Sequence, residues 1–221
     1  RVNACRLSRG IASRFAMTDA DVRSGGAGLV VLSTALHLQK CRPGIDVHVI
    51  EKNDRVAAQQ SGHNSGVIHA GIYYEPGSMK ARFCVEGHRA LQEYCRERGI
   101  PVVKCGKVIV ARGHGESERL EMLHERGTHS PGSAIVDYRQ VAAAYADDLR
   151  DAGGQLHLQT EFVAAKRDGA LQRITTSGPE FRARLIVNCA GLHCDVVSRM
   201  TGTEPRLRII PFRGEYYELK A

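Results

Sequence analysis

The sequence predicts an α/β protein with a parallel central sheet, and three observations support that prediction. Apolar segments of strand length alternate along the chain with longer segments of helical periodicity. A glycine cluster, Gly25, Gly26 and Gly28, stands directly before the first helical segment. Glu51 ends the apolar strand that follows that helix. This order of turn, helix, strand and acid is typical of a dinucleotide-binding unit.

The first elements are predicted from their apolar patterns. Residues 29–40 (LVVLSTALHLQK) have the pattern of a helix, and residues 47–52 (VHVIEK) indicate a buried strand after the turn CRPGID. A strand should precede the glycines, but residues 19–25 are DADVRSG. Arg23 and Ser24 are poor residues for the interior of a central parallel strand. We therefore expect the first strand to be damaged, truncated or replaced.

The remaining elements continue the alternation. Residues 78–98 form the longest helical pattern of the chain. The later elements, in order, are a strand, turn and strand at 99–112, a helix at 137–154, a strand at 155–169, a strand pair at 171–177 and 180–191, and a short helix at 192–202.

Composition excludes several classes of protein. The chain has 221 residues, of which 43% are hydrophobic and 25% charged, as in ordinary globular proteins. Its net charge of +7 is too dispersed for a nucleic-acid-binding surface, and no apolar run is long enough for a membrane-spanning helix. It has no CxxC or HExxH motif, so we expect no metal site. The odd number of cysteines favours reduced, mostly buried thiols in an intracellular compartment: Cys5, Cys41, Cys84, Cys95, Cys105, Cys189 and Cys194.

The N-terminal segment allows two interpretations. Residues 1–16 contain arginines and serines but no acid, and Leu7, Ile11 and Phe15 would share one helix face. This pattern is typical of a mitochondrial presequence. The alternative is that Met17 is the true start of a bacterial cytoplasmic enzyme. The sequence favours neither.

The glycine cluster departs from the usual fingerprint at one position. If Gly26 and Gly28 are the first two glycines of a GxGxxG motif, Val31 replaces the third, and we expect it to push the helix away from the strand. Glu51 is at the right distance to bind ribose hydroxyls, and Lys52 beside it is assigned to the same site. The alternative is a glycine-rich loop followed by a chance acid.

Three motifs carry a specific resemblance. GHNSGVIHAGIYY (62–74), VNCAGLHCDVVSRMTG (187–202) and IIPFRGEYYELK (209–220) resemble the L-2-hydroxyglutarate dehydrogenase/oxidase family of the amino-acid-oxidase-like superfamily. The resemblance runs from about residue 21 to the end of the chain. It implies FAD as cofactor, oxidation of L-2-hydroxyglutarate to 2-oxoglutarate, and an FAD-binding Rossmann-like domain followed by a β-rich substrate domain.

The same resemblance implies a set of cofactor-binding residues. They are Gly26, Gly28, Glu51, Lys52, Ser61, Gly62, His63, Asn64, Ser65, Phe162, Ala190 and Gly191. Small residues let the backbone approach a cofactor closely, and Ser, Asn and His supply hydrogen bonds. Tyr73 and Tyr74 would lie nearer the substrate. The alternatives are that His63 is an ordinary polar loop residue and that Ala190–Gly191 is a plain strand-to-helix turn.

Three residues are candidates for the chemistry. Arg213 offers a bidentate donor for a substrate carboxylate, unless it pairs with Glu215 instead. His69 or His63 would take the hydroxyl proton, because imidazole titrates near neutral pH. The alternative for His69 is a structural histidine that the backbone satisfies.

The expected organisation has three parts. Residues 1–20 are an extension, residues 21–207 the FAD-binding domain with a shortened insertion around 100–130, and residues 208–221 the start of a truncated substrate domain. We therefore expect a fragment. Other interpretations are a different FAD-dependent oxidase acting on an amino acid or glycerol 3-phosphate, an NAD-dependent dehydrogenase, or a catalytically inactive fragment. The electron acceptor stays open, and with it peripheral association with a membrane.

Overall fold

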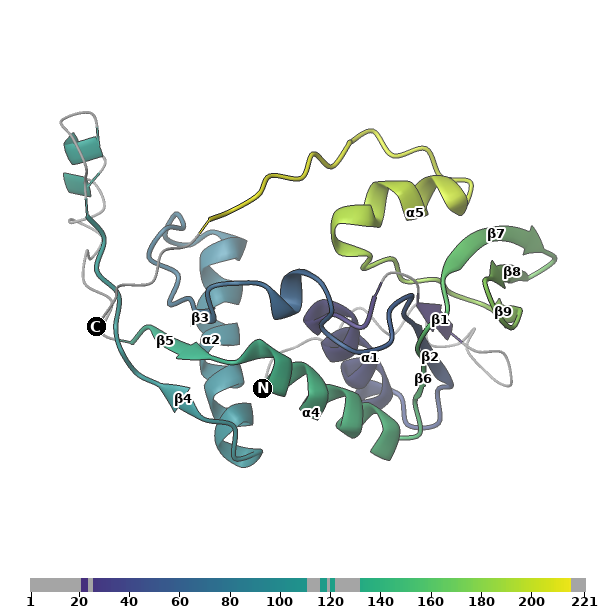
Figure 1. Ribbon diagram of the computed structural model, residues 1–221, viewed down its shortest axis with the longest axis horizontal. Helices are drawn as coiled ribbons and strands as arrows, with labels where there is room; N and C mark the ends of the chain where they lie inside the picture. Colours follow the sequence, from purple (N-terminus) through teal and green to yellow (C-terminus); the bar gives the residue numbers. More distant parts are fainter. Residues whose placement is uncertain (1–20, 24–25, 111–115, 119, 122–131, 216–221) are drawn as a thin grey trace. The chain divides into compact units, whose positions relative to one another are not determined.

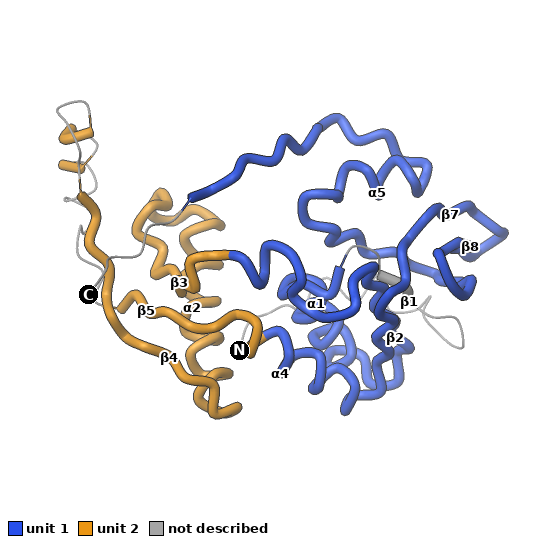
Figure 2. The backbone as a smooth tube through the Cα atoms, viewed as in Figure 1, with its two compact units in different colours: residues 1–63, 142–221 blue, residues 64–141 orange. Residues whose placement is uncertain are grey.

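The computed structural model describes residues 21–23, 26–110, 116–118, 120–121 and 132–215 (Figure 1). The chain divides into two compact units, unit 1 with residues 1–63 and 142–221, and unit 2 with residues 64–141 (Figure 2). This division differs from the expected boundaries after residues 20 and 207, which stay a prediction. The possible presequence, residues 1–16, lies outside the described residues.

A parallel three-stranded sheet forms the centre of unit 1. Its strands are β1 (Asp21–Arg23), β2 (Val47–Ile50) and β6 (Gln155–His157), in the order β1-β2-β6. β1 pairs with β2 over its whole length, from Asp21 opposite Val47 to Arg23 opposite Val49. The first strand is therefore present over Asp21–Arg23 among the described residues, and its expected truncation stays a prediction. Backbone pairing does not depend on side-chain polarity, so a polar sequence can still form it.

One face of β2 packs on two helices. Val47 and Val49 share a core with Ala27 and with buried side chains of α1 (Leu29–Cys41) and α4 (Tyr138–Asp151). Val31 of α1 belongs to this core and is 1% exposed. The core therefore contains the valine that replaces the third glycine. The expected displacement of the helix stays a prediction.

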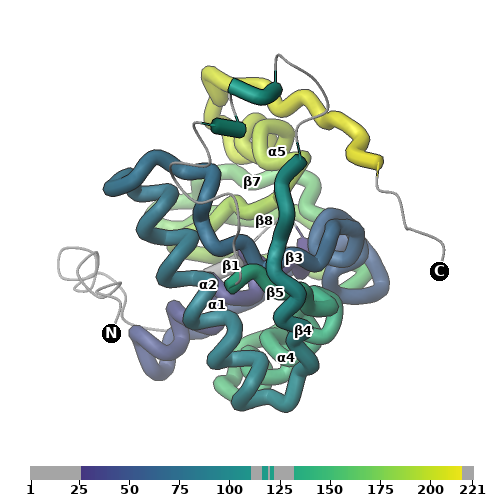
Figure 3. Tube along the Cα trace, turned by 90° about the vertical axis from the view of Figure 1, so that its left-hand side faces the viewer, coloured from purple at the N-terminus to yellow at the C-terminus, as the bar shows by residue number. Residues whose placement is uncertain are grey.

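The other face of β2 packs on an antiparallel sheet. Strands β7 (Phe162–Asp168), β8 (Leu171–Thr176) and β9 (Phe181–Ala183) form that sheet in sequence order. Ile50 shares a second core with these strands and with α5 (Cys194–Met200), which lies beside β7 (Figures 1 and 3). All four residues of β2 are buried, as expected of a central strand that is covered on both faces.

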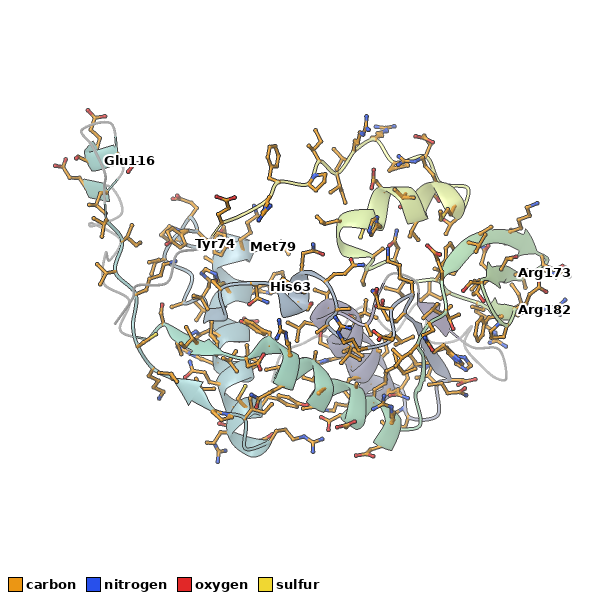
Figure 4. All side chains as sticks on the ribbon, viewed as in Figure 1. His63, Tyr74, Met79, Glu116, Arg173 and Arg182 are labelled. Carbon is orange, nitrogen blue, oxygen red and sulfur yellow. The ribbon has the colours of Figure 1, made fainter. Side chains whose placement is uncertain are left out.

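Polar side chains also make contacts on this face of the parallel sheet and on the surface of the antiparallel sheet. His48 of β2 stacks on His157 of β6 with ring centroids 5.0 Å apart, and the Nε2 of His157 lies 3.0 Å from the Nδ1 of His48. On the hairpin surface, Arg173 and Arg182 both donate to Asp168, at 3.4 Å and 3.1 Å (Figure 4). These exposed ion pairs contribute little to stability.

Unit 2 contains a small antiparallel sheet and the longest helix. The sheet order is β3 (Val67–Ile68), β5 (Ala134–Val136) and β4 (Val102–Val103), and the helix is α2 (Met79–Glu97). Ser78 caps α2, because its Oγ accepts a hydrogen bond of 3.2 Å from the amide of Ala81. The helix predicted at 78–98 is thus confirmed.

Several predicted strands are wrong in extent. The strand predicted at 155–169 is interrupted after His157, where Gln159 has a φ of 51° that ends extended pairing. In the segment predicted as a strand at 180–191, Phe181–Ala183 form the regular strand and Ile186 an isolated bridge. In the segment 99–112, only Val102–Val103 form a regular strand among the described residues.

The cysteines are less buried than expected. Of the six within the described residues, Cys95 alone is buried, while Cys41 and Cys105 are exposed. A thiol tolerates partial exposure, so the expectation of mostly buried thiols was too strong. In the part of the chain that the structure describes, no helix is long and apolar enough to span a bilayer.

Candidate functional site

The glycine cluster forms a loop that is tied directly to Glu51. The carboxylate Oε2 of Glu51 accepts a hydrogen bond from the amide of Ala27. Its Oε1 accepts from the amide and side chain of Asn53, at 2.7 Å and 2.5 Å. Gly26 has a φ of +98°, and a Cβ there would lie 2.9 Å from Oε2. Glycine is therefore required at this position both by the backbone conformation and by the approach of the acid.

The first turn of α1 points its amides at the same loop. Gly28 is the N-cap and provides no side-chain cap, but the Oγ of Ser61 accepts a hydrogen bond of 3.1 Å from the amide of Leu29. Among the described residues, the amides of Val30 and Val31 have no acceptor. A helix start with free amides favours an anion, and the phosphate groups of a dinucleotide are such anions.

Two adjoining cavities in unit 1 border the loop. One has a volume of about 180 Å³ and the other about 170 Å³, and both are lined by Gly26, Glu51, Gln59 and Ala190. The first also contacts Lys52, Phe162 and Thr160, and the second contacts Gly28, Ser61 and Gly191. The cavities thus bring together eight of the twelve predicted cofactor-binding residues: Gly26, Gly28, Glu51, Lys52, Ser61, Phe162, Ala190 and Gly191.

Asn188 holds the turn that closes this side of the cavities. Its Nδ2 donates to the carbonyl of Cys194 at 2.7 Å and to the Oγ of Ser198 at 3.2 Å, and its Oδ1 accepts from the amide of Ala190 at 3.1 Å. Gly191 follows with a φ of +56°. Asn188 therefore fixes the path from the strand end into α5. Its place before the small residues was visible in the sequence, but its side-chain partners were not.

The remaining predicted loop residues do not line these cavities. Gly62 belongs to the short helix Gln60–Gly62, and the exposed His63 has its Nδ1 2.9 Å from the carbonyl of Gln59 (Figure 4). Asn64 is exposed, and its Oδ1 accepts a hydrogen bond of 2.8 Å from the amide of Gly66. Ser65 is also exposed. The side chains of His63 and Asn64 therefore make hydrogen bonds to the backbone of their own turn, and these groups are not free to bind a cofactor in this conformation.

His69 lies in unit 2, just after β3. Partial desolvation lowers the pKa of His69 below its ordinary value although the residue is exposed, and the ammonium group of Lys107 lowers it further. The ring of Tyr73 lies 6.4 Å from the imidazole, centroid to centroid. A neutral imidazole can accept a proton, so this environment suits a general base. Lys107 was not among the predicted site residues.

Arg213 lies in the extended C-terminal segment. Its Nε is 3.9 Å from the Oε1 of Glu215, and its side chain is 89% exposed. The alternative pairing with Glu215 is therefore present, although a pair this exposed is weak. In the described residues, no group of three or more His, Cys, Asp or Glu side chains is arranged to hold a metal ion.

The glycine loop, the start of α1, the end of β2 and the bordering cavities together have the arrangement of a dinucleotide-binding α/β protein. Comparison with known proteins identifies the family more closely. The family model described as FAD dependent oxidoreductase matches residues 26–130 and 123–221, and the chain belongs to that family. The two matched parts meet near the predicted shortened insertion, which stays a prediction.

Curated relatives are L-2-hydroxyglutarate dehydrogenases. The chain is 37% identical to the mitochondrial enzyme of Bos taurus, over 94% of the chain and 53% of the relative. It is 38% identical to the mitochondrial enzyme of Homo sapiens, over 94% of the chain and 54% of the relative. It is 37% identical to the enzyme of Escherichia coli K12, over 88% of the chain and 53% of the relative. The chain therefore spans about half the length of these relatives.

Solved structures share the fold. Glycine oxidase from Geobacillus kaustophilus superposes with a TM-score of 0.72 at 22% identity, over 84% of this chain and 59% of that one. L-alpha-glycerophosphate oxidase from Mycoplasma pneumoniae, solved with FAD bound, gives 0.72 at 23% identity, over 84% and 58%. The predicted fold class, FAD-dependent oxidoreductase family and likeness to L-2-hydroxyglutarate dehydrogenases are thus confirmed. The roles of individual site residues stay predictions.

Proposed function

We propose that the chain binds FAD and oxidises L-2-hydroxyglutarate to 2-oxoglutarate. The observation that supports this most strongly is the identity of 37–38% with enzymes of that name over 94% of the chain. The loop that joins Gly26 to Glu51 supports the cofactor independently, because it offers an acid and free helix amides beside a cavity.

The residues present fit the cofactor. The start of α1 would hold the pyrophosphate, and Glu51 and Lys52 would bind the adenosine ribose. Phe162 would lie against the adenine, and Ala190 and Gly191 would let the backbone approach the dinucleotide. The segment from Ser61 to Ser65 would follow the cofactor toward its ring.

The chain's own residues would bind and orient the substrate. FAD, when bound, supplies the acceptor for the hydride that leaves C2 of the hydroxy acid. His69, or alternatively His63, would take the hydroxyl proton, and the lowered pKa of His69 keeps its imidazole ready to do so at neutral pH. Arg213 would pair with a substrate carboxylate once it leaves Glu215.

Cofactor identity can be tested on the purified chain without any assay of turnover. FAD and NAD are added separately, and the thermal unfolding midpoint and the flavin absorbance of the washed protein are measured. We expect FAD to raise the midpoint and to remain bound, because a ligand that binds only the folded state stabilises it. Stabilisation by NAD but not by FAD would refute the proposed cofactor.

Substrate identity requires a panel. Dye reduction is followed with L-2-hydroxyglutarate, D-2-hydroxyglutarate, glycine and glycerol 3-phosphate, with free FAD as the background. Reduction with the L-enantiomer alone supports the proposal. Preference for glycine or glycerol 3-phosphate would assign the chain to another oxidase class of the same fold.

The location of the chain depends on residues 1–16. The cattle and human relatives are named as mitochondrial, and the Escherichia coli relative is not. A fluorescent protein fused behind residues 1–16 would enter mitochondria if this segment is a presequence. Diffuse fluorescence in the same cells would show that residues 1–16 do not act as a presequence.

A further inference from the structure

Three side chains of unit 2 form a small cluster around the ring of Tyr73. His69 follows β3, Tyr73 lies four residues later, and Lys107 lies in the segment after β4. The Nζ of Lys107 is 4.6 Å from the centroid of the Tyr73 ring, a cation–π distance. The Tyr73 and His69 rings meet edge to face at 6.4 Å. We call these three residues the His69 cluster.

Hydrogen bonds hold the main chain beside two members of the cluster, Lys107 and His69. Gly106, next to Lys107, donates its amide to the carbonyl of Ser133 at 2.9 Å. The thiol of Cys84 on α2 donates to the carbonyl of His69 at 3.3 Å. The alternative in which backbone groups satisfy the imidazole of His69 stays open, because the contact from Cys84 is to the main chain of His69.

Lys107 carries a positive charge for which the described residues supply no acidic partner. Its ammonium group contacts the ring of Tyr73 instead. Tyr73 is 44% exposed, so the cluster is open to solvent and to a solute. A half-buried cation that an aromatic ring holds in position, as Lys107 is, can bind an anion without first breaking an ion pair within the described residues.

We propose that Lys107 binds a carboxylate of the substrate next to His69, with Tyr73 holding the ammonium group in position. This inference rests on the proposed function, which supplies a substrate with two carboxylates. Binding one carboxylate at Lys107 brings the adjoining hydroxyl group toward the imidazole that would take its proton. The same positive charge disfavours protonation of His69. Lys107 would therefore both bind the substrate and keep the imidazole of His69 neutral.

The test measures binding rather than turnover. The full chain is titrated calorimetrically with 2-oxoglutarate and with glutarate, in the wild-type form and as Lys107→Met and Lys104→Met variants. Lys104 is the matched control, because it is an exposed lysine in the same segment. The imidazole of His69 is titrated by NMR in each protein, and its signal is assigned with a His69→Gln variant.

We expect Lys107→Met to weaken binding of both dicarboxylates about tenfold. This is the lower end of the effect of losing a hydrogen bond to a charged group, because the site is partly exposed. We expect it also to raise the pKa of His69, since a neighbouring positive charge is lost. Lys104→Met should change neither quantity. A structural role for Lys107 alone would not alter the titration of His69 and the affinity together.

Two outcomes would overturn the inference. One is equal weakening by Lys107→Met and Lys104→Met, which would indicate general attraction to a basic surface. The other is a wild-type chain that binds neither dicarboxylate. FAD binding is measured on the same samples. Loss of FAD binding with the difference between the two lysines retained would refute the proposed function and still support the Lys107 site.

Discussion

Replacing Gly26 by alanine should damage the cofactor loop through a contact that can be isolated. Gly26 has a φ of +98°, and an added Cβ would lie 2.9 Å from the Oε2 of Glu51. That oxygen accepts the amide of Ala27, and Glu51 is 3% exposed. The methyl group must therefore displace a buried carboxylate that already holds the loop closed.

The expected magnitude has two parts. A positive φ costs a residue with a side chain about 1–2 kcal/mol, and disturbing a hydrogen bond to a buried charge costs about 1.5–3 kcal/mol more. Gly44 provides the control, because its φ is +86° and nothing lies within 4 Å of the position that a Cβ would take there. Gly44→Ala should therefore lose only the first part, about 1–2 kcal/mol.

The assay is urea unfolding of the chain without cofactor. Free energies are compared for Gly26→Ala, Gly44→Ala, Glu51→Ala and the double variant Gly26→Ala/Glu51→Ala. If Glu51 is the group displaced, the penalty of Gly26→Ala in the Glu51→Ala background should fall to that of Gly44→Ala. An unchanged penalty in the double variant, or equal effects at Gly26 and Gly44, would refute the reasoning.

Three further predictions concern the same unit. Glu51→Gln should lower the unfolding free energy by about 1–3 kcal/mol and the affinity for FAD about tenfold. The reason is that the NH₂ group of the glutamine would face an N–H donor at a position where a carboxylate oxygen accepts a hydrogen bond. Urea unfolding and FAD titration check this, and no change in either would contradict it. His157→Gln should reduce the loss of stability below about pH 6.5, because burial, and after it His48, lowers the pKa of His157 in the folded chain. The contribution of His157 to stability is therefore present above its pKa in the unfolded chain and is lost as the pH falls through its pKa in the folded chain. Unfolding midpoints at about pH 7.5 and 5.5 measure this, and an unaltered pH dependence would disprove it. Gln159→Gly should stabilise the chain by up to about 1 kcal/mol, because Gln159 is exposed and has a φ of 51°; a lowered urea midpoint would count against the strain.

The sequence could predict the parts of the fold that follow from repeating patterns. The helical period of residues 29–40 and 78–98 gave α1 and α2 almost to the residue, and VHVIEK gave β2. These segments bury one face or both, so their apolar spacing reflects packing directly. In unit 2, β3 and β5 were not predicted, because strands as short as Val67–Ile68 do not show a period of two.

The site was predictable to the extent that it depends on residue type at fixed spacing. Gly26, Gly28 and Glu51 do meet at one loop, as the fingerprint requires. Lys107 could not be found in this way, since nothing in the order of residues places it beside His69, which stands 38 positions earlier. Only the fold brings the ammonium group of Lys107 close enough to lower the pKa of the His69 imidazole.

The hydrogen bonds of Glu51 bear on how a dinucleotide could bind. Each carboxylate oxygen can accept about two hydrogen bonds. Oε1 already accepts two from Asn53, whereas Oε2 accepts one, from Ala27. A ribose has two neighbouring hydroxyl groups, and only the second of them would have to replace an internal donor. Glu51 therefore contributes to the stability of the unliganded loop through three bonds and to affinity mainly through one. Asn53→Ala, which frees one acceptor position on Oε1, should lower the unfolding free energy while leaving affinity for FAD unchanged or higher. A parallel loss of both would mean that Asn53 itself contacts the cofactor.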